Sequence, residues 1–170
     1  RLVLAGHLVP LAYEMLSKQT TMTWGGDVAL LMSRLVGNPA ALGEDFNVCT
    51  SRHQSWGEVA GVYRSVVPLR VREVTLAEYE RAAGGIYQCR YDRMFDRVMD
   101  NTKILGATGM SEHDLAGIEE RLPYELETFL SGLRFRAVPM RPLGRLDRLG
   151  GGIFGPIALR RITGTDAMGI

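Results

Sequence analysis

A run of arginines between residues 90 and 97 has the clearest capacity for chemistry in this sequence. The run reads RYDRMFDR, so three arginines lie within eight residues and aromatic side chains stand between them. Guanidinium groups can grip a pyrophosphate with paired hydrogen bonds, and an aromatic ring can stack on a uracil or guanine base. The alternative interpretation is a solvated basic segment whose arginines pair with Asp92, Asp96 and Asp100.

Two other patterns imitate catalytic or cofactor motifs without their context. Gly150–Gly155 satisfies GxGxxG, but that motif binds pyrophosphate only between a strand and a helix, and here Pro156 follows. Tyr13 and Lys18 lie five positions apart rather than four, which puts them on different faces of a helix. The three histidines and two cysteines have no metal-ligand spacing. We therefore assign no catalytic, cofactor-binding or metal residue.

Helices that could position the arginine run begin at recognisable capping signals. Ser55 with Glu58, and Thr75 with Glu78, have the spacing of a capping box, in which each side chain accepts from the other residue's amide. The Asp100-Asn101 pair can cap a helix over residues 102–108, with a glycine at its end.

Strand candidates are few and short. Thr20–Trp24 and Phe46–Thr50 are rich in β-forming residues, and Leu69–Val74 alternates apolar with basic residues. Asp27 is expected to cap or begin a helix over Val28–Val36 that is apolar around most of its surface and therefore buried. Few strands with several helices predict a small α/β lobe rather than a complete doubly wound sheet.

Composition limits the class of protein. The 170 residues are 46% hydrophobic and 23% charged, which fits a globular domain. Basic and acidic residues nearly cancel, 20 against 19, so no net field attracts nucleic acid or an anionic membrane. No apolar run reaches the ~18–20 residues of a membrane span, and two isolated cysteines suit a reducing cytoplasm. We expect a lobe over residues 1–132 and a loosely packed basic tail with Gly and Pro over residues 133–170.

Three segments occur together in an order typical of one enzyme family. They are WGGDVA at residues 24–29, NPAALGEDFNV at residues 38–48, and residues 91–109, where the arginines precede a helix that ends in ATG. Over residues 1–131 the sequence resembles the C-terminal half of extended short-chain dehydrogenase/reductases, the NAD-dependent epimerase/dehydratase family. The resemblance implies the substrate-binding lobe of a Rossmann-type enzyme, without the N-terminal Rossmann domain. The family's TGxxGxxG turn and catalytic Tyr-x-x-x-Lys do not occur in this sequence.

The resemblance also implies a function. The chain would grip the diphosphate of a UDP- or GDP-linked nucleotide sugar, with Arg93 as the first choice of contact and Arg97, Arg90 and Asn101 as further substrate-binding residues. NAD would act in the intact enzyme, which the family resemblance allows to be a homodimer, but would not bind this chain alone. The chain alone is expected to be inactive. The alternative is a non-catalytic binding or interaction module derived from the same lobe.

Overall fold

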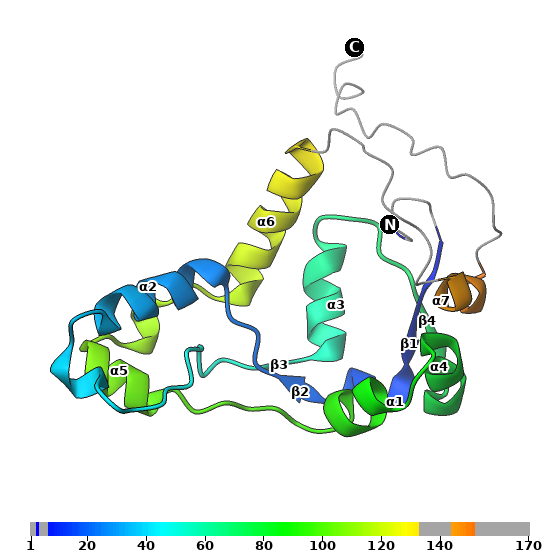
Figure 1. Cartoon of the computed structure of the whole chain (residues 1–170). Coiled ribbons are helices and arrows are strands. Elements are labelled where there is room, and N and C mark those ends of the chain that lie inside the picture. The colour runs from blue at the N-terminus through cyan, green and yellow to red at the C-terminus, as the bar shows by residue number, and fades with distance from the viewer. Residues whose placement is uncertain (1–2, 4–6, 133–143, 152–170) are drawn as a thin grey trace, which may run out of the picture.

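Two small pairs of strands lie among short helices in the computed structural model, which describes residues 3, 7–132 and 144–151 (Figure 1). This arrangement confirms an α/β class with few strands. The strands are β1 (Val9–Ala12), β2 (Gln19–Thr20), β3 (Gln54–Ser55) and β4 (Val71–Val74). The helices are α1 (Tyr13–Leu16), α2 (Gly25–Leu35), α3 (Trp56–Arg64), α4 (Leu76–Ala83), α5 (Thr102–Thr108), α6 (Ile118–Gly132) and α7 (Gly144–Leu149). Single turns add η1 (Pro39–Ala41), the π-helical η2 (Cys89–Arg93) and η3 (Glu112–Asp114).

The strand pairs fix the position of the arginine run. β1 pairs in parallel with β4, and β2 pairs antiparallel with β3. Arg97 lies along β2, because its amide donates to the Gln19 carbonyl at 3.0 Å and its carbonyl accepts from the Thr21 amide at 2.9 Å. The end of the arginine run is thus bound to a strand about 77 residues earlier in the sequence.

Two of the expected strands differ from the structure. Of the strand expected over residues 20–24 only Thr20 belongs to a strand, at the end of β2, and residues 46–50 form no strand. The second segment is held by other contacts: Asn47 donates from its side chain to the Asp100 carbonyl at 3.0 Å, and the Thr50 amide donates to Thr23 Oγ1 at 3.1 Å. Side-chain contacts of this kind hold the segment in place of a sheet ladder.

Among the residues that the structure describes, the buried apolar side chains form two separate clusters rather than a single core. One lies between β1, β4 and α4, and the other between α2 and α5 (Figure 1). The strands β2 and β3 and the start of α3 lie between them. The first cluster contains Ala12, Met15, Val74, Tyr79 and Cys89, and the second contains Leu31, Ile104 and Leu115.

Both capping boxes are confirmed. Ser55 Oγ accepts from the Glu58 amide at 3.1 Å, and the Glu58 carboxylate accepts from the Ser55 amide at 2.7 Å. Thr75 and Glu78 make the same reciprocal pair at 3.2 and 2.8 Å. Each cap contributes about 1 kcal/mol to helix stability. The first box makes Trp56 the first residue of α3.

The expectation for the helix after Asp27 is wrong in two respects. The helix α2 begins at Gly25, and Asp27 does not cap it; Asp27 Oδ1 instead accepts from the Ala116 amide at 3.1 Å. Among its apolar residues only Leu31 is buried, whereas Met32 is 56% exposed. One face of α2 packs on α5, whereas Met32 and Leu30 remain on its exposed side.

The expected tail falls mostly outside the described residues, as do residues 152–155 of the glycine motif. The part that the structure describes is not loose: Leu146 and Leu149 of α7 pack against the first apolar cluster. Within the described ranges, no helix combines the length and apolar character that crossing a membrane requires.

Candidate functional site

The indole of Trp56 brings two of the predicted arginines together. The guanidinium carbon of Arg93 lies 5.5 Å from the ring centroid, and that of Arg97 lies 6.0 Å from it. Both distances fall at the outer reach of a cation–π contact, which extends to about 6 Å. Trp56 is half-buried, so its ring can serve as a fixed platform for the two cations. Trp56 and the arginines come from segments about 40 residues apart, which the sequence did not connect.

Arg93 is held without a neutralising carboxylate. Its Nη1 donates to the phenol oxygen of Tyr79 at 3.3 Å, and Tyr79 is only 7% exposed because its ring belongs to the first apolar cluster. No carboxylate in the described ranges lies within ion-pair distance of Arg93. The Trp56 ring and the Tyr79 phenol therefore position the Arg93 guanidinium, and no carboxylate of the described residues neutralises its charge.

Arg97 makes three kinds of contact. Its backbone pairs with that of β2. Its Nη2 donates to Thr20 Oγ1 at 3.2 Å, and its Nη1 lies 2.6 Å from Asp92 Oδ1. Its Nε is buried and finds no acceptor among the described residues, and the same holds for Nε1 of Trp56.

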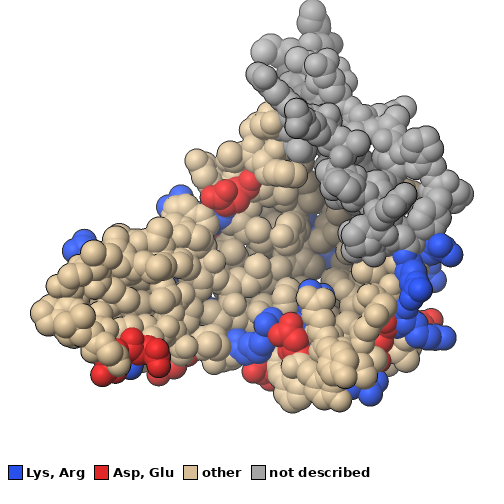
Figure 2. Space-filling model, in the orientation of Figure 1, with Lys and Arg blue, Asp and Glu red and all other residues tan. Residues whose placement is uncertain are grey.

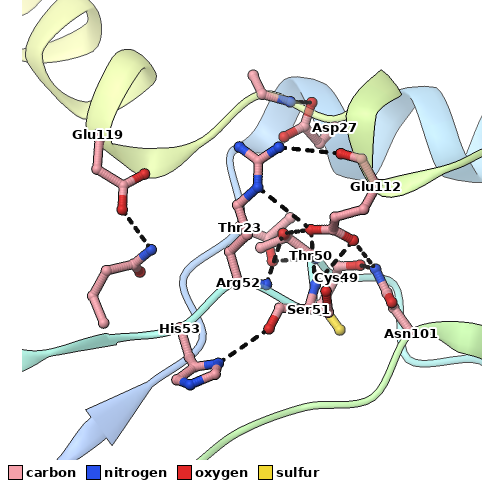
Figure 3. A network of polar contacts seen from close by, with 12 residues as sticks. Thr23, Asp27, Cys49, Thr50, Ser51, Arg52, His53, Asn101, Glu112 and Glu119 are labelled. Atoms are coloured by element: carbon pink, nitrogen blue, oxygen red, sulfur yellow. Dashed lines mark hydrogen bonds and ion pairs between the residues drawn. The ribbon is translucent and has the colours of Figure 1, made fainter.

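Arg90 and Asn101 do not join this group. Arg90 binds Glu80 with two hydrogen bonds, Nε to Oε1 at 3.1 Å and Nη2 to Oε2 at 2.9 Å, and this pairing raises the pKa of its guanidinium. Asn101 is 3% exposed and donates from Nδ2 to the Cys49 carbonyl at 2.9 Å and to Glu112 at 2.7 Å (Figure 3). Its side chain therefore has structural partners on both sides.

Sequence reasoning missed the network around Glu112 (Figure 3). The Glu112 carboxylate accepts hydrogen bonds from the Thr50 hydroxyl, the Ser51 amide and Asn101. Burial raises the pKa of Glu112, but these hydrogen bonds together outweigh it and hold the pKa below its ordinary value. The network joins three chain segments, and no local motif signals it. We assign it a structural role.

Other reactive side chains show no second chemical centre. Burial raises the pKa of the Cys49 and Cys89 thiols, which makes both weak nucleophiles. No group of three or more His, Cys, Asp or Glu is arranged to hold a metal ion within the ranges that the structure describes.

Basic side chains are spread over the face drawn in Figure 2. Lys and Arg atoms gather over α4 and α7, and a smaller group lies near β2 and β3, each beside acidic atoms. A shallow hollow of about 390 Å³ lies between α4 and α7, lined partly by Glu80, Arg81 and Arg145. Arg93 and Arg97 do not line this hollow, so the hollow and the arginines on Trp56 are two different candidate sites. We favour the arginines on Trp56, because their contacts define a specific chemistry.

No protein-family model matches the sequence, and comparisons with curated proteins and with solved structures find no match. Function therefore has to be inferred from the arrangement of Trp56, Arg93 and Arg97.

Proposed function

We propose that this chain binds the diphosphate of a nucleotide sugar at Arg93 and Arg97, on the platform of Trp56. One observation carries the proposal: the Arg93 cation is held by Trp56 and Tyr79 and has no carboxylate partner among the described residues. A phosphate oxygen would supply the missing charge. Arginine forms strong, two-pronged hydrogen bonds to phosphate, and these need a guanidinium in a fixed orientation.

The surroundings of Arg93 support this proposal. Contacts on two sides reduce the conformational entropy that the side chain loses when a ligand binds. Arg97 adds a second guanidinium beside the same ring. Trp56 is the first residue of α3, so the partial positive charge at this helix terminus lies close to the site.

The ligand class follows from the sequence resemblance. A UDP- or GDP-linked sugar is the substrate expected of the substrate-binding lobe of an epimerase/dehydratase, and the fold is proposed to be that lobe of a Rossmann-type enzyme. In this proposal the NAD site and the catalytic Tyr-x-x-x-Lys belong to residues outside this sequence. The chain alone then binds substrate without turning it over.

The test is titration calorimetry with UDP-glucose and GDP-mannose. We expect micromolar binding of at least one of them, and Arg93→Ala should weaken it by about tenfold or more, because a charge-assisted hydrogen bond is lost. Arg93→Lys should keep only part of the affinity that Arg93→Ala loses. An ammonium keeps the charge but lacks the paired N–H donors of a guanidinium.

Arg34→Ala is the matched control, because Arg34 is an exposed arginine in the last turn of α2. It should leave binding unchanged. A folded chain that binds neither nucleotide sugar would contradict the proposal and favour the non-catalytic interaction module. An Arg93→Ala variant that binds as tightly as the wild type would contradict the role of Arg93.

A further inference from the structure

An ion pair inside the candidate site occupies one of its two arginines. Asp92 Oδ1 lies 2.6 Å from Arg97 Nη1, and the two side chains are 37% and 40% exposed. Asp92 belongs to the turn η2 and directly precedes Arg93 in the chain. The carboxylate of the residue next to Arg93 in the chain is therefore bonded to Arg97.

The remaining donors of Arg97 show why this pair matters. Nη2 donates to Thr20, and Nε is buried. Nη1 is the donor that Asp92 holds, and Nη1 and Nη2 each carry a second N–H. A phosphate oxygen that approaches Nη1 therefore meets the Asp92 carboxylate and competes with it for the guanidinium.

No other acid of the arginine run takes this place. Asp96 Oδ1 accepts from the Gln19 amide at 2.8 Å, and the nearby Glu80 pairs with Arg90. Neither carboxylate pairs with Arg97 in the structure. Asp92 alone among these acids competes directly with a ligand.

We propose that Asp92 is a specificity-determining residue that stands in for one phosphate of the ligand and competes with that phosphate for Arg97. This inference rests on the proposed function. A ligand with one phosphate can bind Arg93 and leave the ion pair closed. A ligand with two linked phosphates reaches Arg97 as well, and its charge-assisted bonds replace an exposed ion pair, which is a weak interaction. Asp92 thus lowers the affinity for a diphosphate while it keeps Arg97 in place.

The experiment is calorimetry of Asp92→Asn with inorganic pyrophosphate and, separately, orthophosphate at one ionic strength. We expect pyrophosphate to bind roughly two- to fivefold more tightly than to the wild type, the factor that an exposed ion pair corresponds to. Orthophosphate should change less. Asp92→Glu, which keeps the charge, should bind pyrophosphate as the wild type does.

Glu44→Gln is the matched control for net charge. Glu44 also forms an exposed ion pair, 2.8 Å from Lys103, beside the other apolar cluster. Equal tightening in Glu44→Gln would overturn the inference, because net charge alone would then explain the effect. Thermal unfolding of each variant confirms that it is folded.

The remaining outcomes separate the two proposals. If Asp92→Asn leaves pyrophosphate affinity unchanged or weakens it, while binding to the wild type depends on Arg93, Asp92 is no competitor and the proposed function stands. If neither the wild type nor Asp92→Asn binds pyrophosphate or a nucleotide sugar, both proposals are wrong.

Discussion

The phenol oxygen of Tyr79 accepts a hydrogen bond from Arg93 Nη1 at 3.3 Å. Tyr79 is buried in α4, whereas Arg93 lies half-buried at the end of η2. The contact therefore fixes a surface cation to a side chain that packing already holds. The orientation of Arg93 depends on the first apolar cluster as much as on its own segment.

Removing the Tyr79 hydroxyl should weaken ligand binding with little effect on folding. In Tyr79→Phe the ring still fills its place, but Arg93 loses the acceptor that orients it. We expect nucleotide-sugar affinity to fall about three- to tenfold, measured by calorimetry. Tyr124→Phe, at an exposed tyrosine of α6, is the control and should bind as the wild type does. Equal affinities in the two variants would show that Arg93 needs no acceptor.

The two capping boxes offer a paired test of the Trp56 platform. Ser55→Ala and Thr75→Ala each remove one cap, and each should lower the free energy of unfolding by about 1 kcal/mol. Ser55→Ala loosens the turn that carries Trp56 itself, whereas Thr75→Ala can act on the site only through Tyr79 of α4. Ser55→Ala should therefore reduce nucleotide-sugar affinity more, by up to about fivefold. Chemical denaturation and calorimetry measure the two effects. The same loss of affinity in both variants would indicate a general loss of stability instead.

Local signals predicted the parts of the fold that local interactions determine. Ser55 and Thr75 cap their helices with bonds three residues away, and Gly109 ends α5 with a positive φ of 67°. The burial of α2 could not be predicted in the same way. Leu31 is buried because α5 packs on it, and the apolar pattern of α2 alone does not say which faces have a neighbour.

The candidate site was predictable only in part for a similar reason. The spacing of Arg93 and Arg97 drew attention to phosphate chemistry, and both lie at Trp56. Trp56 and Tyr79 carry no motif for this role and are brought in by tertiary structure. Arg90 resembles its neighbours in the sequence, but Glu80, ten residues earlier, accepts two hydrogen bonds from its guanidinium, one from Nε and one from Nη2.

The pH dependence of stability should reveal the Glu112 network. The pKa of Glu112 is lowered in the folded chain, because hydrogen bonds to its carboxylate outweigh the effect of burial. A depressed folded-state pKa gives a stabilising contribution that is present above the unfolded pKa, near 4.3, and is lost as pH falls through the folded value. Glu112→Gln should cost about 1–2 kcal/mol at pH 7.

Comparing the wild type with Glu112→Gln separates the effect of the Glu112 carboxylate from that of the other carboxylates. Unfolding free energies measured from pH 7 down to about pH 3 should converge as the pH drops below the ordinary carboxyl range near 4.3. A difference that stays constant over this range would mean that the charge of Glu112 contributes nothing, and that only its shape matters.

Asn101 distinguishes a structural role from a ligand contact. Its amide joins the Cys49 carbonyl to Glu112 inside the network around Glu112, away from the guanidinium groups on Trp56. Asn101→Ala leaves a buried carbonyl and a carboxylate short of a donor, so the free energy of unfolding should fall by about 1–3 kcal/mol. At a low temperature at which Asn101→Ala is still folded, it should bind nucleotide sugar with wild-type affinity. Arg93→Ala should show the reverse, a weaker affinity with little change in the free energy of unfolding. A selective loss of binding in Asn101→Ala, with stability unchanged, would instead make Asn101 a ligand contact and move the site toward the start of α5.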